Sequence, residues 1–186
     1  MSSEPEAEPE AEPEAAPVTE ESVAEPPRGH LTWLVIAVAT AVWLLDQVSK
    51  LVIVHFMADR GDIRLPGGLI TITYTRNPGA AFSVGTGTTW AFTLVAVVVA
   101  VIIIRTSRRL GSKWWAVCLG GLLGGAVGNL TDRILREPGI FRGHVVDFIH
   151  PSHFAVFNLA DAAITCSAIG MILLSLLGVE LDGRRR

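Results

Sequence analysis

Two aspartates, Asp147 and Asp161, stand in apolar surroundings where an ordinary surface carboxylate is not expected. Asp147 lies in the run VVDFI, which has no basic neighbour, and Asp161 lies in FNLADAAI. Two carboxyl groups close together at low dielectric share one proton, because the first charge opposes the second ionisation. The ionised carboxylate can activate water while its protonated partner polarises a carbonyl, which is the chemistry of aspartic peptidases. The residues alone leave transport and structural pairing open as alternatives.

A second group of polar residues also falls inside or beside apolar sequence. Asp46 and Lys50 are four residues apart, so a helix would place them on one face, where they can neutralise each other. A structural ion pair and a chemical role both remain open for them. Asn129 and Arg133 have the same spacing and could hydrogen-bond loop carbonyls or a substrate backbone. Asp132 is expected to pair with Arg133 or to face solvent.

Long apolar blocks are the elements that must hold these residues. Half of the 186 residues are hydrophobic, and the mean hydropathy is +0.46. The apolar residues come in continuous blocks rather than at amphipathic spacing, which is typical of membrane spans. We expect four transmembrane helices, at about residues 31–56, 90–104, 114–130 and 154–178. In the third block, three glycines at helical spacing should let neighbouring helices approach closely: Gly121, Gly125 and Gly128.

The segment between the first two spans contains a β signal. Residues 69–75 read LITITYT, a run rich in β-branched side chains. Turn signals flank it on both sides, Pro66-Gly67-Gly68 before it and Asn77-Pro78-Gly79 after it. A short β element at the outer membrane face is therefore expected.

Charge is unevenly distributed, and this divides the chain into three parts. Residues 1–27 hold nine of the eighteen Asp and Glu and no Lys or Arg. This Glu, Pro and Ala composition cannot bury enough apolar surface to fold, so we expect a disordered acidic tail over 1–29. A four-span membrane domain follows over 30–180, and a basic cytoplasmic C-terminus over 181–186. The basic surplus outside the tail is normal for membrane-protein loops and gives no case for nucleic-acid binding.

The short basic loops predict the orientation. RTSRRLGSK, residues 105–113, carries four basic residues and no acid, and the sequence closes with three arginines. The positive-inside rule places both segments, and therefore both termini, in the cytoplasm. The loops at about 57–89 and 131–153, and with them the two aspartates, then lie at the outer face.

Five short motifs occur in order on this layout: DQVSK at 46–50, NPGAAFS at 77–83, GNLTDR at 128–133, VVDF at 145–148 and FNLADAAI at 157–164. Together they resemble the lipoprotein signal peptidase (signal peptidase II) family, over essentially residues 31–177. The resemblance implies an all-α membrane protein with four transmembrane helices, a small extracytoplasmic β-cradle and a short outer helix or loop. It also implies an aspartic endopeptidase that cleaves prolipoproteins before a lipid-modified cysteine, without metal or other cofactor.

Matched motif by motif, the resemblance makes Asp147 and Asp161 the catalytic acids. Substrate binding or support of the site is implied for the other motif residues: Asn77, Gly125, Asn129, Arg133, Asn158, Ala160, Asp46 and Lys50. The implied partners are diacylglyceryl-modified prolipoproteins and membrane lipids, for a monomer in the bacterial inner membrane. One departure is the stretch 133–147, which is longer than the family spacing, with Glu137-Pro138-Gly139 as an apparent extra turn expected to bulge outward.

Two alternatives use the same residues differently. A metal-dependent peptidase could take ligands that recur every third residue, namely His144, Asp147, His150 and His153. However, the sequence has no HExxH motif, and Pro151 interrupts any regular helix through the set. An ion or proton carrier could use the membrane acids as a relay. It would need acids spread through the bilayer depth and often shows inverted repeats, which are not evident here.

The orientation can be tested with topology reporters. A reporter fused after Arg109 should report a cytoplasmic position, because the basic loop is retained inside, and one inserted near Gly61 should report an external position. Reversed signals would place the two aspartates on the wrong side for an enzyme that acts on exported precursors.

Overall fold

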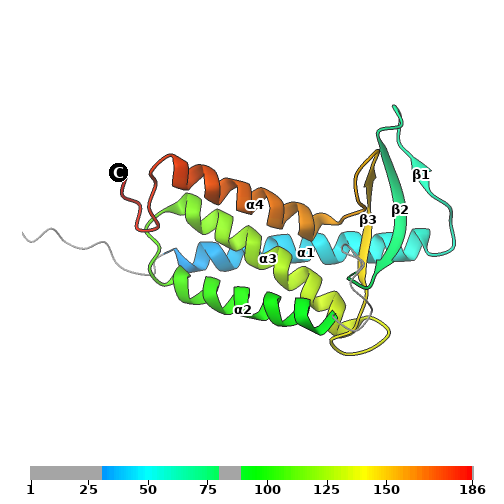
Figure 1. Ribbon diagram of the computed structural model, residues 1–186, viewed down its shortest axis with the longest axis horizontal. Helices are drawn as coiled ribbons and strands as arrows, with labels where there is room; N and C mark the ends of the chain where they lie inside the picture. Colours follow the sequence, from blue (N-terminus) through cyan, green and yellow to red (C-terminus); the bar gives the residue numbers. More distant parts are fainter. Residues whose placement is uncertain (1–30, 80–88, 186) are drawn as a thin grey trace, which may run out of the picture.

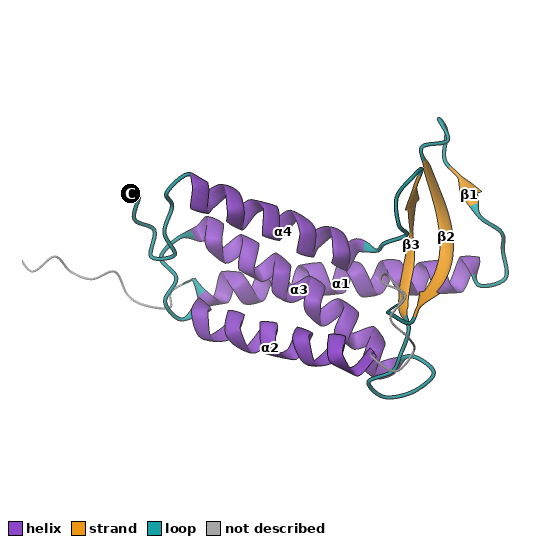
Figure 2. Cartoon of the chain, viewed as in Figure 1, coloured by secondary structure: helices purple, strands orange, loops and turns teal. Residues whose placement is uncertain are grey.

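The computed structural model describes residues 31–79 and 89–185. The acidic segment 1–29 and most of the NPGAAFS motif therefore lie outside the described residues. Four helices form an elongated bundle, and a small β-sheet stands across one end of it (Figures 1 and 2). The helices are α1 (Thr32–Met57), α2 (Thr89–Ser107), α3 (Lys113–Leu135) and α4 (Leu159–Leu176).

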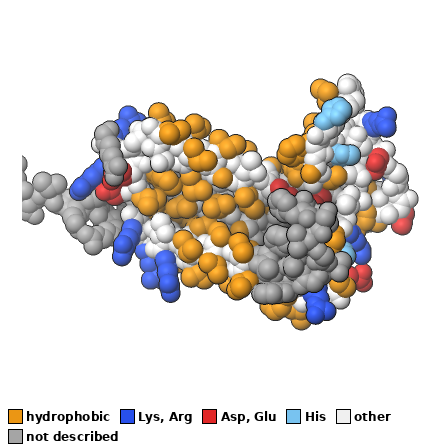
Figure 3. Space-filling model, in the orientation of Figure 1, with side chains coloured by type: hydrophobic (Ala, Val, Ile, Leu, Met, Phe, Trp, Pro, Cys, Tyr) orange, Lys and Arg blue, Asp and Glu red, His pale blue; other side chains and the backbone are white. Residues whose placement is uncertain are grey.

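Three of the described helices, α1, α3 and α4, are long and apolar enough to cross a membrane. The described apolar stretch of α2, Leu94–Ser107, is shorter, so a fourth crossing stays a prediction. Large apolar side chains cover the outside of the bundle, among them Leu45, Ile102 and Leu176 (Figure 3). A surface of this extent is unfavourable in water but suits contact with lipid. The chain is therefore a membrane-embedded protein.

Helix α3 is the central element, because it contacts each of the other three helices. Its glycines form two stripes that touch neighbouring backbone. A Cβ atom on Gly124 would stand 2.5 Å from the carbonyl oxygen of Ala39 in α1, and one on Gly125 would stand 2.6 Å from that of Ala160 in α4. The predicted close approach is confirmed, and it occurs on two sides of α3 rather than one. Any larger side chain at these positions would push helices apart.

The sheet contains three antiparallel strands in the order β1 (Ile63–Arg64), β2 (Ile70–Asn77) and β3 (Val145–Pro151). The β element predicted at 69–75 is confirmed as β2, which extends to Asn77. Strand β3 was not predicted. Its pairing with β2 sets Thr75 opposite Asp147 and Asn77 opposite Val145, with an irregularity between Ile72 and Thr75.

Several predicted boundaries need correction. Helix α3 continues to Leu135 instead of ending at 130, so the GNLTDR motif is helical throughout. Helix α4 begins at Leu159 instead of 154, because Asn158 caps it and the preceding residue, Phe157, pairs with Ile149 of β3. The predicted outer helix or loop is a series of turns over 136–144 in the described chain, and it includes the expected turn at 137–139.

The C-terminal residues fold back on the bundle at the end opposite the sheet (Figure 1). The backbone N–H groups of Gly111 and Ser112 donate to the carbonyl of Leu181, at 2.9 and 3.2 Å. The indole N–H of Trp115 donates to the carbonyl of Val179 at 2.8 Å. The described part of the predicted basic C-terminus, up to Arg185, is therefore packed against the turn between α2 and α3.

Candidate active site

The two aspartates come from different elements and meet at Asn158. Asp147 lies on β3 and is 2 % exposed, whereas Asp161 lies in the first turn of α4 and is half-buried. The side-chain amide of Asn158 donates to Asp147 Oδ1 at 2.6 Å. Its backbone N–H donates to Asp161 Oδ2 at 3.3 Å, and its Oδ1 accepts from the backbone N–H of Asp161 at 3.0 Å. One helix-capping residue thus touches both carboxylates.

Two further asparagines complete the hydrogen bonds to the pair. Asn77, the last residue of β2, donates from Nδ2 to Asp147 Oδ2 at 2.8 Å. Asn129, on α3, donates from Nδ2 to Asp161 Oδ1 at 2.8 Å. All four carboxylate oxygens of the pair therefore accept an N–H group, from residues of three different elements. Such donors fix the orientation of both carboxylates and stabilise their charge.

A buried ammonium group stands behind the asparagines. Lys50 Nζ lies 2.8 Å from Asp46 Oδ2 and 2.8 Å from Asp132 Oδ2, and it donates to Asn129 Oδ1 at 3.0 Å. The side chains of the three charged residues are 0–1 % exposed. The predicted Asp46–Lys50 pair is confirmed. It is part of a larger cluster in which all three ammonium donors have an acceptor.

Asp132 corrects one expectation and was missed as a site residue. It is 1 % exposed, so it does not face solvent, and its electrostatic interaction with Arg133 is one of several. Its carboxylate contacts Lys50 and the Nε atom of Arg136, and it accepts the backbone N–H of Val146 at 3.2 Å. The spacing of Asp132 and Arg136, one helical turn, was the available sequence signal. The prediction failed because α3 was expected to end before this turn.

The aspartates of this cluster also hold the elements that carry the pair. Asp46 Oδ1 accepts the backbone N–H of Ala160 at 3.0 Å, which ties α1 to the start of α4. The bond from Val146 to Asp132 ties α3 to β3 beside Asp147. Ala160 is fully buried. The structure thus brings Asp46, Lys50 and Ala160 together with the carboxylate pair.

The remaining predicted site residues divide into two kinds. Arg133 interacts electrostatically with Asp147, Asp132 and Asp161, so its charge belongs to the site. Gly125 instead lies in the contact between α3 and α4, facing the Ala160 carbonyl. Its position fits helix packing.

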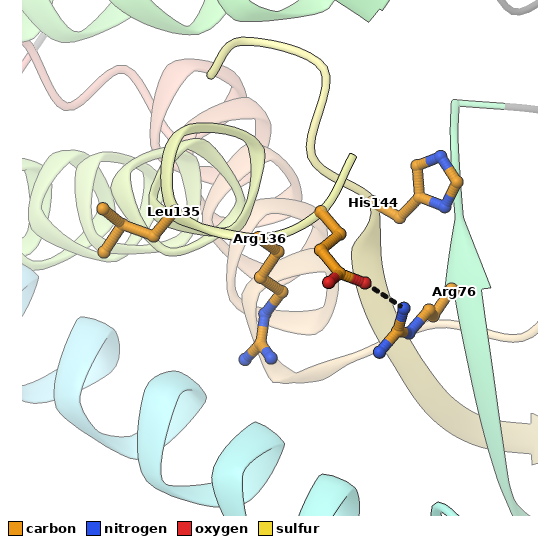
Figure 4. Close-up of a pocket in the computed structure, with 5 residues that line it drawn as sticks. Arg76, Leu135, Arg136 and His144 are labelled. Carbon is orange, nitrogen blue, oxygen red and sulfur yellow. Dashed lines mark hydrogen bonds and ion pairs between the residues drawn. The ribbon is translucent and has the colours of Figure 1, made fainter. Parts of the chain in front are cut away.

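A cavity of about 200 Å³ lies beside the site, between the sheet and the end of α3 (Figure 4). It is lined by Arg76, Leu135, Arg136, Glu137 and His144. Arg76 Nη1 lies 3.2 Å from Glu137 Oε2, so the extra turn contacts β2 next to Asn77. Both side chains are largely exposed, so this ion pair contributes little stability.

The ligand set of a metal-dependent peptidase is not assembled. The residues between Val145 and Pro151 form a strand, in which side chains three apart point to opposite faces. Asp147 is buried, whereas His150 and His153 are exposed. Within the described residues, no three His, Cys, Asp or Glu side chains are grouped to hold a metal ion.

The carrier alternative is also poorly supported by the arrangement. Asp46 and Lys50 contact the residues that carry the aspartate pair, so these groups form one cluster near the sheet. A relay through a bilayer needs groups at several depths. The cluster instead resembles a local catalytic or binding site.

Burial raises the pKa of Asp147 from 3.8 to about 6, because the buried carboxylate loses hydration. The negative charge of Asp161 acts in the same direction. The hydrogen bonds from Asn77 and Asn158 and the charge of Lys50 oppose the increase without cancelling it. The environment of Asp147 thus favours a proton on this carboxyl up to about pH 6.

This raised pKa predicts a pH-dependent stability. Because the folded protein binds the Asp147 proton more tightly than the unfolded chain, the contribution of Asp147 to stability is fully present below pH 3.8 and is lost as pH rises to about 6. The loss corresponds to roughly 3 kcal/mol. Melting temperatures of the wild type and of Asp147→Asn should therefore diverge between pH 4 and 7, with the wild type declining relative to the variant. Parallel curves would contradict the assignment.

The family model and the most similar relatives all point to the same family of peptidases. The family described as signal peptidase (SPase) II matches residues 38–177. A lipoprotein signal peptidase of Rhodococcus jostii is 45 % identical over 153 residues, covering 82 % of this chain and 77 % of that protein. One of Streptomyces coelicolor is 50 % identical over 147 residues, covering 79 % and 72 %.

A solved structure shares the fold. It is a bacterial membrane enzyme determined by the in meso method at 1.9 Å resolution. The TM-score is 0.70 and the sequence identity 27 %, with 81 % of this chain and 97 % of that chain covered.

Proposed function

Because the chain belongs to the signal peptidase II family, we propose that it removes signal peptides from prolipoproteins as an aspartic endopeptidase, with Asp147 and Asp161 as the catalytic pair. The observation that carries the catalytic type is the contact of both carboxylates with Asn158, which holds them in one site. Their elements are separate in sequence, and every oxygen of the pair has an N–H donor. Two carboxyl groups held in one site can share a proton and activate a water molecule between them.

The charges around the pair support a single shared proton. Three cationic groups, Lys50, Arg133 and Arg136, lie within the network. They face four carboxyl groups, namely Asp46, Asp132, Asp147 and Asp161. With one proton on the pair the cluster is neutral, and a neutral cluster avoids the large cost of a buried net charge.

The division of roles follows from exposure. Asp147 is the more buried carboxyl and holds the proton, so it donates a hydrogen bond to the carbonyl oxygen of the scissile peptide bond. Asp161 is half-buried and accepts a proton from the attacking water. Asp147 passes its proton to the carbonyl oxygen as the water oxygen bonds to the carbon, which gives a tetrahedral diol. When the C–N bond breaks, Asp161 gives its proton to the leaving nitrogen and Asp147 takes one back from a diol hydroxyl, so both carboxyl groups return to their starting state.

The asparagines act as positioning residues. The Oδ1 atom of Asn77 accepts the backbone N–H of Gly79 while its amide holds Asp147. Asn129 has its oxygen on Lys50 and Asn158 and its nitrogen on Asp161. Their amide nitrogens therefore orient the carboxylates, and their amide oxygens hold the amides in place. Arg133, whose charge interacts with both carboxylates of the pair, is proposed to hold substrate carbonyls beside them.

The site is proposed to lie at the outer face of the bacterial cell membrane, with both termini in the cytoplasm. The basic loop 105–113 and the packed C-terminus are at the end of the bundle opposite the sheet, as the positive-inside rule requires. A diacylglyceryl-modified cysteine would hold the precursor at this interface, where its acyl chains can rest against exposed apolar side chains. The protein is proposed to act as a monomer.

Replacement of either carboxyl tests the catalytic type. Asp147→Asn and Asp161→Asn should each lower cleavage of a lipid-modified prolipoprotein by at least about a hundredfold, because each removes one acid–base group. Thermal melting should show that both variants remain folded. EDTA should have no effect on the wild type. Near-normal turnover in either variant would disprove the pair, and inhibition by EDTA would favour a metal-dependent peptidase.

Lipid on the precursor should act mainly by positioning. Acyl chains already in a bilayer gain little free energy on binding, so their benefit is to fix the cysteine at the depth of the pair. The purified enzyme should therefore cut unlipidated precursor much more slowly than lipidated precursor. Arg133→Ala should impair cleavage of the lipidated form without unfolding the protein. Equal rates for the two precursors would exclude this mechanism even if both aspartates proved essential.

A further inference from the structure

The end of the bundle opposite the sheet carries a strong positive charge. Figure 3 shows Lys and Arg side chains gathered there. We call this surface the basic end and define it by six exposed residues: Arg105, Arg108, Arg109, Lys113, Arg184 and Arg185. The described acids nearby are Glu180 and Asp182, of which Asp182 pairs with Arg184 at 3.5 Å. The surface therefore has about four positive charges in excess.

The acidic segment of the chain leads directly into this surface. Leu31 packs against the core cluster that contains Leu110 and Ala116, on either side of the turn between α2 and α3. The hydroxyl of Thr32 donates to the carbonyl of Ser107 at 3.2 Å. Residues 1–27 hold nine glutamates and no Lys or Arg. The most negative part of the sequence is thus joined, within a few residues, to the most positive described surface.

The length of the acidic segment and its high effective concentration both favour its contact with the basic end. Glu25 is six residues from Leu31, a span of at most about 20 Å, and the other glutamates have longer tethers. A tethered segment has an effective concentration in the millimolar range, so weak individual attractions suffice. Opposite charges of this number attract over roughly 8–10 Å at physiological salt.

We propose that the glutamate-rich segment 1–27 binds the basic end of its own chain and screens it from other polyanions. The contact rests on the number of charges, so it needs no defined fold of the segment. It screens Arg108, Arg109 and Lys113 from the anionic headgroups of the same membrane leaflet. The carboxylate pair is at the other end of the bundle, so the contact is independent of the peptidase reaction.

The lysines of this chain offer a direct test. It has two, Lys50 and Lys113, and Lys50 is fully buried whereas Lys113 is exposed on the basic end. A water-soluble carbodiimide joins a carboxylate to an amine only when the two touch. Treatment of the full-length protein, one copy per nanodisc of zwitterionic lipid, should link Lys113 to glutamates between Glu4 and Glu25, as read by peptide mass spectrometry. At about 0.5 M salt, where screening is strong, the linked fraction should fall several-fold.

Matched variants separate binding from simple tethering. Arg108→Gln with Arg109→Gln removes two charges of the basic end but keeps Lys113 and the segment, so it should lower the linked fraction several-fold. Arg60→Gln with Arg142→Gln removes two exposed charges from the sheet end and should leave it unchanged. An equal linked fraction in both double variants would show that tethering alone brings the groups together. That result, or no link to Lys113 in the wild type, would overturn the proposal.

Discussion

The rest of the site depends on the buried ammonium group of Lys50. Taking one charge out of water costs several kcal/mol, and the cost is offset only when good partners surround it. Lys50 has two carboxylates and an amide oxygen within 3.0 Å. Each carboxylate partner in turn accepts a backbone N–H from the element that carries one catalytic candidate, Ala160 beside Asp161 and Val146 beside Asp147. A single charge thus connects α1, α3, α4 and β3.

The amide of Asn129 links the charge of Lys50 to the carboxylate pair. Because its oxygen accepts from Lys50, its nitrogen must face Asp161. The orientation of the Asn158 amide is fixed as well, since its oxygen caps α4 and its nitrogen is shared between Asp147 and Asn129. Amide side chains usually allow two orientations. Here the neighbouring charges permit one, so the donors to both carboxylates are fixed before any substrate arrives.

The spacing of residues along one helix correctly predicted the features that depend on that helix. It did not predict the contacts between segments that are distant in sequence. The Asp46–Lys50 pair and the close-packed glycines of α3 follow from helical periodicity, and both are confirmed. Strand β3 was missed because a short apolar run such as VVDFI does not distinguish a strand from a helix. The partner of Asp132 was missed because Lys50 is 82 residues away in sequence and reaches it only through the packing of α1 on α3.

The glycine contacts of α3 also fix the position of the site along the helix axis. Backbone touches backbone on two sides of the helix, so any shift in register would bring a leucine or valine to a point where only hydrogen fits. Asn129 follows Gly121 by eight residues, or about 12 Å along the axis. The number of residues between Gly121 and Asn129 therefore determines how far the carboxylate pair lies from the middle of the bundle. One inserted residue in this interval would rotate Asn129 by about 100° and turn its amide away from Asp161. The turns at 136–144 lie outside this interval, so the chain can lengthen there without changing the position of Asn129 relative to the glycine contacts.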